Sequence, residues 1–321
     1  MKRPKVLIVG AKGQLGVVLT RYLQDRYGFD QVIASDLHET PFLIESKYEK
    51  LDATDQHAVL EVVVKHGITH IYHMAAILSA KGEEKPIVAW ELNMKTLINI
   101  LEVARISKVK RVFYPSSIAV YGGEYDRTNT DNDTPLTPST VYGISKVAGE
   151  NWANYYYQKY NLDVRSLRYP GVIGYQSMPS GGTTDYAVEI FHRALVDRAY
   201  TCYLSEDTKL PMIFIDDAIR ATVEIMEAPQ DKITRRTSYN LAGISFTPAT
   251  LATAIQKEIP DFNINYQPDF RQQIADQWPQ VINDKKAQED WNWKPAYDLP
   301  RMVAVMLSEL QKEFTSKTTL D

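Results

Sequence analysis

Short apolar segments alternate with segments of helical length over the first half of the chain. Residues 6–9, 32–36, 69–73, 111–114 and 163–168 have the composition of buried strands, and apolar residues recur at helical spacing between them. Parallel strands need crossover connections of this length, and right-handed crossovers place helices on both faces of the sheet. The pattern therefore predicts an α/β fold with a doubly wound parallel sheet of the Rossmann type.

Three glycines, Gly10, Gly13 and Gly16, follow the first predicted strand and lead into the first predicted helix. Without side chains, they permit a tight turn and let backbone amides approach a pyrophosphate at the positive end of that helix. Their spacing differs from the common Gly-x-Gly-x-x-Gly pattern, so a plain turn is the alternative. We expect this loop, with Gln14 and Leu15 at the start of the helix, to bind a dinucleotide.

The end of the second predicted strand indicates which dinucleotide. Asp36 lies twenty residues after Gly16, where its carboxylate can accept hydrogen bonds from both hydroxyls of the adenosine ribose and repel a 2′-phosphate. Leu37 follows it, where an arginine would favour NADP. We therefore expect NAD as the cofactor, with a turn-forming role for Asp36 as the alternative. Asp52, after the third strand, either contacts the adenine or ends its strand.

Tyr142 and Lys146 lie one helical turn apart, so their side chains project from the same face of a helix. The pKa of a tyrosine is ordinarily about 10, and a nearby positive charge lowers it toward the pH at which a general base works. Tyr-x-x-x-Lys also occurs in ordinary solvated helices. Ser116 and Ser117, at the end of the preceding strand, favour the catalytic interpretation.

The regular alternation breaks after residue 173. Residues 176–184 are rich in Gly, Ser, Pro and Thr, as in a loop, and short strand-like segments follow. We expect an NAD-binding domain over residues 1–173, with returns to it near 213–227 and 238–246. A smaller, interleaved substrate-binding lobe is expected over residues 174–321.

Bulk properties exclude several classes of partner. The net charge of −4 and the pI of about 5.9 give no general attraction to nucleic acid or acidic membranes. We find no apolar segment near the eighteen or so residues that a membrane span needs. The single cysteine, Cys202, excludes an intrachain disulfide and a multi-cysteine metal site. We expect a cytoplasmic protein without a metal.

The sequence resembles the extended short-chain dehydrogenase/reductase superfamily over nearly its whole length. Besides the glycines, Asp36 and the Tyr142–Lys146 pair, the matching motifs are His73-Met74-Ala75-Ala76, Asn93, Ser116-Ser117-Ile118-Ala119-Val120-Tyr121-Gly122, Arg168-Tyr169-Pro170-Gly171-Val172 and Trp291-Asn292-Trp293-Lys294-Pro295. The resemblance implies an NAD-dependent oxidoreductase in which Tyr142 is the base, Lys146 lowers its pKa and holds the nicotinamide ribose, and Ser117 binds the reacting oxygen. It also implies cofactor contacts from Met74, Ala75, Ala76, Asn93, Tyr169 and Val172.

A narrower resemblance comes from Gly181-Gly182-Thr183-Thr184-Asp185-Tyr186, which looks like the substrate loop of the short-chain family of L-threonine 3-dehydrogenases. It implies that NAD oxidises the β-hydroxyl of threonine to give 2-amino-3-oxobutanoate. Thr183 and Thr184 offer donors for the substrate carboxylate, and Asp185 offers a partner for its ammonium. Thr184 and Asp185 can instead cap the helix that follows.

The same resemblance adds Ser79 and Trp278 to the wall of the substrate site. It also implies a homodimer or higher homo-oligomer, formed by the helix after Pro86 and the helix of Tyr142.

Two other functions share the same motifs. One is a nucleotide-sugar epimerase or dehydratase, which would need basic residues to hold a diphosphate. The candidates are Arg193, Arg198, Arg235, Arg236 and Arg271. The other is a regulatory protein that binds NAD without turnover, which the intact Ser117, Tyr142 and Lys146 disfavour.

Overall fold

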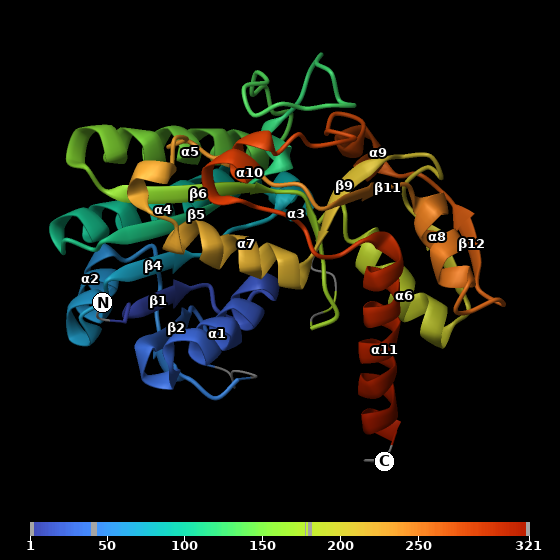
Figure 1. Cartoon of the computed structure of the whole chain (residues 1–321), viewed down its shortest axis with the longest axis horizontal. Helices are drawn as coiled ribbons and strands as arrows, with labels where there is room; N and C mark the ends of the chain where they lie inside the picture. The colour runs from blue at the N-terminus through green and yellow to red at the C-terminus, as the bar shows by residue number, and fades with distance from the viewer. Residues whose placement is uncertain (1–2, 40–43, 177, 179–181, 319–321) are drawn as a thin grey trace.

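The computed structural model describes residues 3–39, 44–176, 178 and 182–318 (Figure 1). Its main body is a seven-stranded sheet with the strand order β10-β6-β5-β4-β1-β2-β3, and all neighbouring strands are parallel. The strands are β1 (Val6–Val9), β2 (Val32–Asp36), β3 (Lys47–Lys50), β4 (His70–His73), β5 (Arg111–Ser117), β6 (Asp163–Tyr169) and β10 (Tyr239–Asn240). The predicted doubly wound α/β fold is confirmed.

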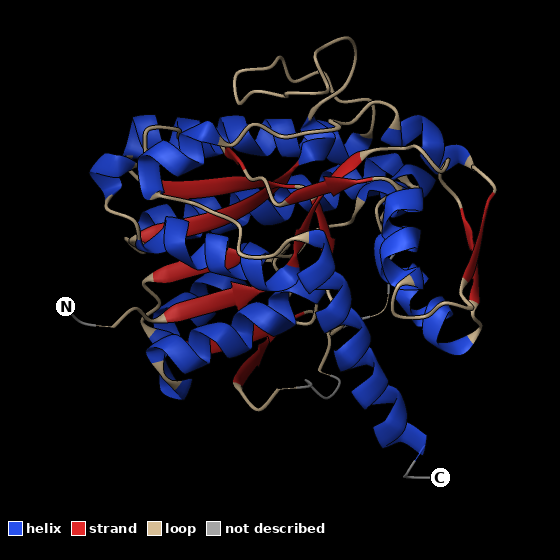
Figure 2. Ribbon diagram, turned by 45° about the vertical axis from the view of Figure 1, so that its right-hand side comes forward, coloured by secondary structure: helices blue, strands red, loops and turns tan. Residues whose placement is uncertain are grey.

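Helices cover both faces of this sheet (Figure 2). On one face α1 (Gln14–Tyr27) packs against α7 (Ile215–Glu227), and on the other α4 (Pro86–Ile106) packs between α2 (Gln56–His66) and α5 (Val141–Tyr160). Alternate side chains of a strand point to opposite faces, so Val6 and Ile8 join one hydrophobic core whereas Leu7 and Val9 join the other. Burial on both faces explains why these strands are continuously apolar.

Local sequence signals fix the ends of the elements where the chain carries capping residues. The Asp55 carboxylate accepts hydrogen bonds from the backbone N–H groups of His57 and Ala58 and begins α2. Gly67, with a φ of 60°, ends that helix in the left-handed conformation. Helix α2 therefore has the limits expected from its caps.

The remaining elements form a smaller lobe beside the carboxyl edge of the main sheet (Figure 1). It holds one three-stranded sheet, one two-stranded sheet and several helices. The strands are β7 (Gly171–Ile173), β9 (Leu210–Phe214) and β11 (Ile244–Phe246) in the first sheet, and β8 (Ala199–Cys202) and β12 (Asn263–Tyr266) in the second. Its helices are α6 (Tyr186–Val196), α8 (Pro248–Gln256), α9 (Phe270–Ala275) and α11 (Leu299–Thr318), whereas α10 (Lys285–Trp291) packs against β10 of the main sheet.

The chain passes between lobe and main body several times. β10 pairs with β6, so the chain returns to the main sheet at Tyr239–Asn240. The segment near 213 differs from the expectation, because β9 pairs with β7 and β11 and only the helix after it, α7, lies against the main body. The departure from the main sheet occurs at Pro170, between β6 and β7, where proline cannot donate to a strand ladder.

Within the described ranges, every helix is too short or too polar to cross a lipid bilayer.

Candidate active site

The carboxyl ends of β1, β2, β4, β5 and β6 meet at one edge of the sheet, because these strands are parallel. This is the edge at which open α/β sheets bind ligands. Two adjacent cavities lie there, one of about 320 Å³ beside Asp36 and one of about 150 Å³ beside Tyr142. Met74 and Ala76, which follow β4, line both.

The glycine loop is packed too closely for side chains at two of its three positions. Gly10 has a φ of +86°, and a Cβ there would lie 2.6 Å from the Ala75 nitrogen. A Cβ on Gly16 would lie 2.3 Å from the Gly10 carbonyl oxygen. Gly13 precedes α1, whose first N–H groups receive no side-chain cap from it. This arrangement leaves a helix N-terminus open to an anion.

Asp36 lines the larger cavity together with Leu37 and Asp52. Its carboxylate accepts hydrogen bonds from the backbone N–H groups of Lys12 at 3.0 Å and Leu37 at 2.8 Å. These contacts tie the end of β2 to the glycine loop. Asp52 accepts hydrogen bonds from the N–H and hydroxyl of Thr54, both at 2.8 Å, so it forms a turn at the same cavity.

Lys12, whose charge is a notable feature of the loop, points toward the edge of the sheet. Its Nζ donates a 2.5 Å hydrogen bond to the His38 carbonyl and lies 5.0 Å from the centre of the Tyr48 ring. The Lys12 backbone thus contacts Asp36, and its ammonium contacts the residue two positions further along.

Asn93 lies behind the loop that follows β4. Its side-chain carbonyl accepts a 2.8 Å hydrogen bond from the Ile77 N–H, and its amide donates a 3.2 Å hydrogen bond to the Ile77 carbonyl. In the described part of the chain Asn93 lines neither cavity, whereas Met74, Ala75 and Ala76 all line the larger one. Asn93 holds that loop in place, and a direct cofactor contact from it stays a prediction.

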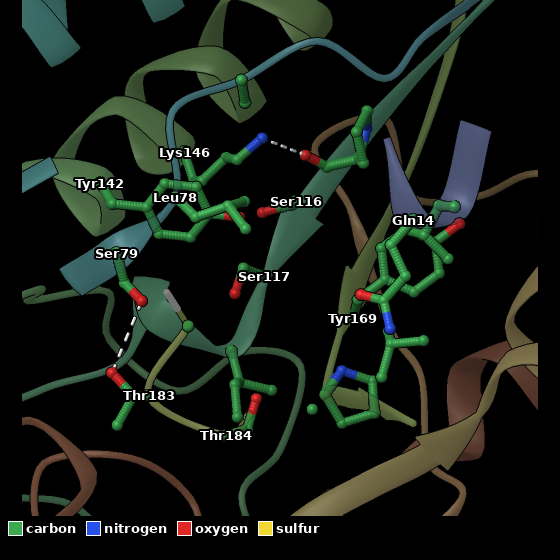
Figure 3. Close-up of a pocket in the computed structure, with 18 of the residues that line it drawn as sticks. Gln14, Leu78, Ser79, Ser116, Ser117, Tyr142, Lys146, Tyr169, Thr183 and Thr184 are labelled. Carbon is green, nitrogen blue, oxygen red and sulfur yellow. Dashed lines mark hydrogen bonds between the residues drawn. The ribbon is translucent and has the colours of Figure 1, made fainter. Parts of the chain in front are cut away.

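Helix α5 begins at Thr140, whose hydroxyl accepts a hydrogen bond from the Gly143 N–H, and it directs Tyr142 and Lys146 into the smaller cavity (Figure 3). The Lys146 Nζ lies 5.3 Å from the centre of the Tyr142 ring and donates a 2.6 Å hydrogen bond to the Pro115 carbonyl. Ser117, at the end of β5, lines the same cavity. The structure thus brings the three predicted catalytic residues together.

Burial has the largest effect on the pKa values of Tyr142 and Lys146. It raises the pKa of Tyr142 to about 12, against a hydrogen bond with Ser117 that lowers it. Burial also lowers the pKa of Lys146 to about 7, against the charge of Glu150 that raises it. Desolvation therefore sets both pKa values, because it penalises phenolate and ammonium alike, and the lowering of the Tyr142 pKa below 10 that the sequence led us to expect does not occur in this structure.

The far wall of the cavity carries the predicted substrate residues. Ser79, the first residue of α3 (Ser79–Glu84), has its hydroxyl 3.5 Å from that of Thr183, and both side chains are buried (Figure 3). Thr184 and Trp278 also line the cavity. Asp185, likewise in the wall, accepts a 2.8 Å hydrogen bond from the Gly182 N–H.

Asp185 precedes α6, and among the described residues its side chain makes no capping hydrogen bond to that helix. Gly181, part of the matching motif, lies outside the described residues.

Tyr169 and Val172 line the cavity as predicted, and so do several residues that the sequence analysis did not select. These are Leu78, Pro115, Ile118, Pro170, Gly171 and Gly182. Pro170 and Gly171 lie inside the motif that contains Tyr169 and Val172, so the motif itself held a signal for them. Leu78 lies in the segment Ala75-Ala76-Ile77-Leu78-Ser79, which also resembles that of the L-threonine 3-dehydrogenase family.

The two cavities together fit a dinucleotide. The uncapped helix and the side-chain-free loop suit a pyrophosphate, and Asp36 at the end of β2 suits ribose hydroxyls. Gln14 and Leu15, at the start of α1, line the smaller cavity and connect the loop to Tyr142.

Known proteins share this sequence and fold. Residues 6–242 match the NAD dependent epimerase/dehydratase family. The chain is 44% identical over 307 residues to the mitochondrial L-threonine 3-dehydrogenase of Bos taurus, covering 95% of this chain and 82% of that protein.

Solved structures agree with this similarity. The GalE-like L-threonine dehydrogenase from Cupriavidus necator in its holo form superposes with a TM-score of 0.94 and 52% identity, covering 96% of this chain and 100% of that one. A monomeric L-threonine 3-dehydrogenase from a metagenome, in its apo form, gives a TM-score of 0.93 and 44% identity, covering 96% and 99%. Because the family match covers most of the sequence, this chain belongs to the NAD dependent epimerase/dehydratase family.

Proposed function

We propose that the protein is an NAD-dependent L-threonine 3-dehydrogenase, which oxidises the β-hydroxyl of threonine to give 2-amino-3-oxobutanoate and NADH. One observation carries the proposal: Tyr142, Ser117 and a wall of small hydroxyl side chains line one cavity of about 150 Å³. Pockets for drug-sized ligands measure about 300–1,000 Å³, so this space suits a very small substrate. The similarity to L-threonine dehydrogenases over 95% or more of the chain supports the same substrate.

The chemistry follows from the residues around the cavity. Tyr142, as phenolate, removes the proton of the substrate hydroxyl, and the Ser117 hydroxyl donates a hydrogen bond to the oxygen as it becomes a carbonyl. Lys146 stabilises the phenolate with its positive charge. The hydride that leaves the β-carbon would be accepted by NAD when the cofactor is bound.

Threonine requires partners for a carboxylate, an ammonium and a methyl group, because an unpaired charge in a closed site binds weakly. We assign the carboxylate to the hydroxyls of Ser79 and Thr183, with Thr184 beside them, and the ammonium to Asp185. Leu78 and Trp278 supply apolar surface for the methyl group. Within the described residues, the charged side chains of this lining are Lys146 and Asp185.

A nucleotide-sugar enzyme would hold a diphosphate with basic residues in the lobe. The five arginines proposed for that purpose are absent from the described lining of the cavity and pair with acidic residues elsewhere. The pairs are Arg193 with Glu189 and Asp197, Arg198 with Asp261, Arg235 with Asp133, Arg236 with Asp163, and Arg271 with Asp269. This placement favours the small substrate.

The test is NADH formation at 340 nm from NAD and L-threonine, beside D-threonine, L-allo-threonine, L-serine and NADP. Turnover that depends on L-threonine and prefers NAD supports the proposal. Retained NAD without net NADH formation favours an epimerase. A protein that binds NAD but turns over none of these substrates also favours a nucleotide-sugar enzyme, and one that in addition leaves nucleotide sugars unchanged favours the regulatory alternative.

We also propose a homodimer formed through α4 and α5. Ile144, Trp152 and Tyr155 lie at intervals of eight and three residues on α5, and all three are exposed on one stripe. Ile87 and Trp90 are exposed near the start of the neighbouring helix α4. Large aromatic and aliphatic side chains on adjacent helices are typical of the centre of an interface. One relative is described as monomeric, so the oligomeric state of this chain has to be measured on the protein itself.

For location we propose the cytoplasm. The single cysteine, Cys202, is buried and forms no disulfide bond, and free thiols are typical of proteins in reducing compartments. The role that fits the proposed reaction is threonine catabolism.

A further inference from the structure

A buried ion pair lies directly behind the catalytic side chains. Glu150, on α5, is 1% exposed, and its carboxylate accepts hydrogen bonds from Arg168 Nε at 2.9 Å and Nη2 at 2.8 Å. The same carboxylate accepts a 2.6 Å hydrogen bond from the hydroxyl of Ser116, the neighbour of Ser117 on β5. Arg168 continues the network by donating to Tyr121 at 2.8 Å and to the Asn132 carbonyl at 2.9 Å.

We propose that Glu150 is a positioning residue of the catalytic site, which keeps the shared proton of the Tyr142–Lys146 pair on Lys146 and fixes the end of β5 beside Ser117. The inference rests on the proposed function for its effect on rate. Its effect on Lys146 is independent of the substrate. A purely structural ion pair would hold the fold together without acting on that proton.

The position of Glu150 on the helix carries the first half of the argument. Glu150 follows Lys146 by four residues on α5, so the two side chains project from the same face. Burial lowers the pKa of Lys146, and the negative charge of Glu150 opposes that effect. Because both groups are removed from water, their interaction is screened less than a surface pair would be.

The other groups around Lys146 do not replace this charge. Its Nζ lies 4.7 Å from the ring centre of Tyr114 on β5 and 5.3 Å from that of Tyr142 on its own helix, and both are neutral phenols at neutral pH. His73 on β4 is neutral as well, because burial and then Lys146 lower its pKa to about 3. Arg168 on β6 is positive and pairs with Glu150 itself.

The consequence concerns where one proton resides. The pair can hold that proton on the ammonium, with Tyr142 as the active phenolate, or on the tyrosine, with a neutral lysine. A negative charge nearer to Lys146 than to Tyr142 favours the first arrangement. Loss of that charge therefore lets the pair lose its first proton at lower pH, and it lowers the active fraction at pH values above the Lys146 midpoint.

The decisive test measures Lys146 directly, without substrate. Protein labelled with ¹³C at the lysine ε-carbon is titrated by NMR, and the Lys146 signal is the one missing from Lys146→Met. Its midpoint, about 7 in the wild type, should fall by about one pH unit in Glu150→Gln. An unchanged midpoint in a folded Glu150→Gln protein overturns the inference, whether or not the protein oxidises threonine.

Kinetics provide the second readout. In Glu150→Gln, kcat should fall about tenfold while the KM for threonine changes less than about threefold, and the acid limb of the kcat profile should move to lower pH. Glu150→Asp keeps the charge and should keep the midpoint of Lys146. Ser116→Ala removes only the brace on β5 and should lower kcat without moving the acid limb. If the limb stays fixed in Glu150→Gln, Glu150 is structural only.

Two further variants serve as a matched control and as a substitute in case Glu150→Gln does not fold. Glu227→Gln makes the same chemical change in a more exposed pair with Arg26 and should leave the Lys146 midpoint unchanged. If Glu150→Gln does not fold because Arg168 is left without its partner, Glu150→Gln/Arg168→Met removes both buried charges together. Its Lys146 midpoint should fall in the same direction by a smaller amount, and a midpoint equal to the wild type contradicts the proposal.

Discussion

The ammonium of Lys146 donates a 2.6 Å hydrogen bond to the carbonyl oxygen of Pro115, two residues before Ser117 on the same strand. This contact joins α5 to β5 at the point where the catalytic side chains meet. It also holds a lysine that is 3% exposed in a position where water cannot solvate its charge. The lysine that we propose as catalytic is therefore also a destabilising residue.

The first prediction follows from that burial. Since the pKa of Lys146 falls from 10.5 to about 7 on folding, the folded protein binds fewer protons than the unfolded chain between these values. The destabilisation is complete below pH 7 and disappears as the pH rises toward 10.5. Lys146→Met should raise the free energy of unfolding by about 2 kcal/mol at pH 6, and by less at pH 9, while abolishing turnover. Urea unfolding at both pH values measures this difference, and an equal gain at both would contradict it.

The second prediction concerns Tyr142 as the base. Tyr142→Phe removes the hydroxyl and keeps the ring, so kcat should fall by about 10³-fold or more, whereas the Kd for NAD should change less than about threefold. Steady-state kinetics measure kcat, and isothermal titration calorimetry with NAD measures the Kd. Substantial residual turnover would show that another group removes the proton.

A third prediction uses two glycines of the cofactor loop that differ in the space around them. A Cβ on Gly16 would lie 2.3 Å from the Gly10 carbonyl, whereas a Cβ on Gly13 would make an ordinary contact of 3.5 Å with the same atom. Gly16→Ala should destabilise the protein by about 2–4 kcal/mol, and Gly13→Ala by less than about 0.5 kcal/mol. Chemical unfolding of both variants tests this, and equal losses would mean that the loop packs differently.

The fourth prediction concerns the choice of dinucleotide. Asp36 should discriminate against the 2′-phosphate by charge, so the wild type should use NAD at least 100-fold more efficiently than NADP. Asp36→Asn keeps the size of the side chain and should reduce that ratio at least tenfold, largely by weakening the use of NAD. The ratio of kcat/KM values for the two cofactors is the measurement, and a ratio near one in the wild type would remove Asp36 from this role.

The fifth prediction tests the proposed dimer. Trp152→Glu places a charge in the exposed stripe of α5 and should convert the dimer to a monomer. Trp152 is 39% exposed and outside the described lining of the active-site cavity, so the monomer should retain its fold and its site. Light scattering coupled to size exclusion gives the mass of both proteins. A wild type that is already monomeric would exclude this interface in solution.

Sequence patterns were sufficient for the main body of the fold. Buried parallel strands must be apolar on both faces, so Val6–Val9 and Val32–Asp36 are recognisable as short apolar segments. A Cβ on Gly16 would lie 2.3 Å from a backbone oxygen, so this position requires glycine. That requirement explains why the loop motif can be recognised in the sequence. The i, i+4 spacing of Tyr142 and Lys146 likewise follows from helix geometry alone.

The smaller lobe was less predictable because its pairing is not local. β9 pairs with β7 and β11, which are separated from it by dozens of residues, and no periodicity within Leu210–Phe214 distinguishes this sheet from the main one. The position of Leu78 in the cavity wall is likewise decided only by the tertiary fold, which brings it to the same cavity as Tyr142.

The sequence by itself determined the doubly wound sheet and the glycine loop, and it pointed to the side chains that we propose as catalytic, because each depends on short-range spacing and backbone sterics. The tertiary structure alone decided the pKa values of these side chains and the residues that they contact. Desolvation raises the pKa of Tyr142 and lowers that of Lys146, and it depends on how completely other segments exclude water. The Glu150–Arg168 pair, which joins α5 to β6, depends in the same way on contacts between elements that folding brings together.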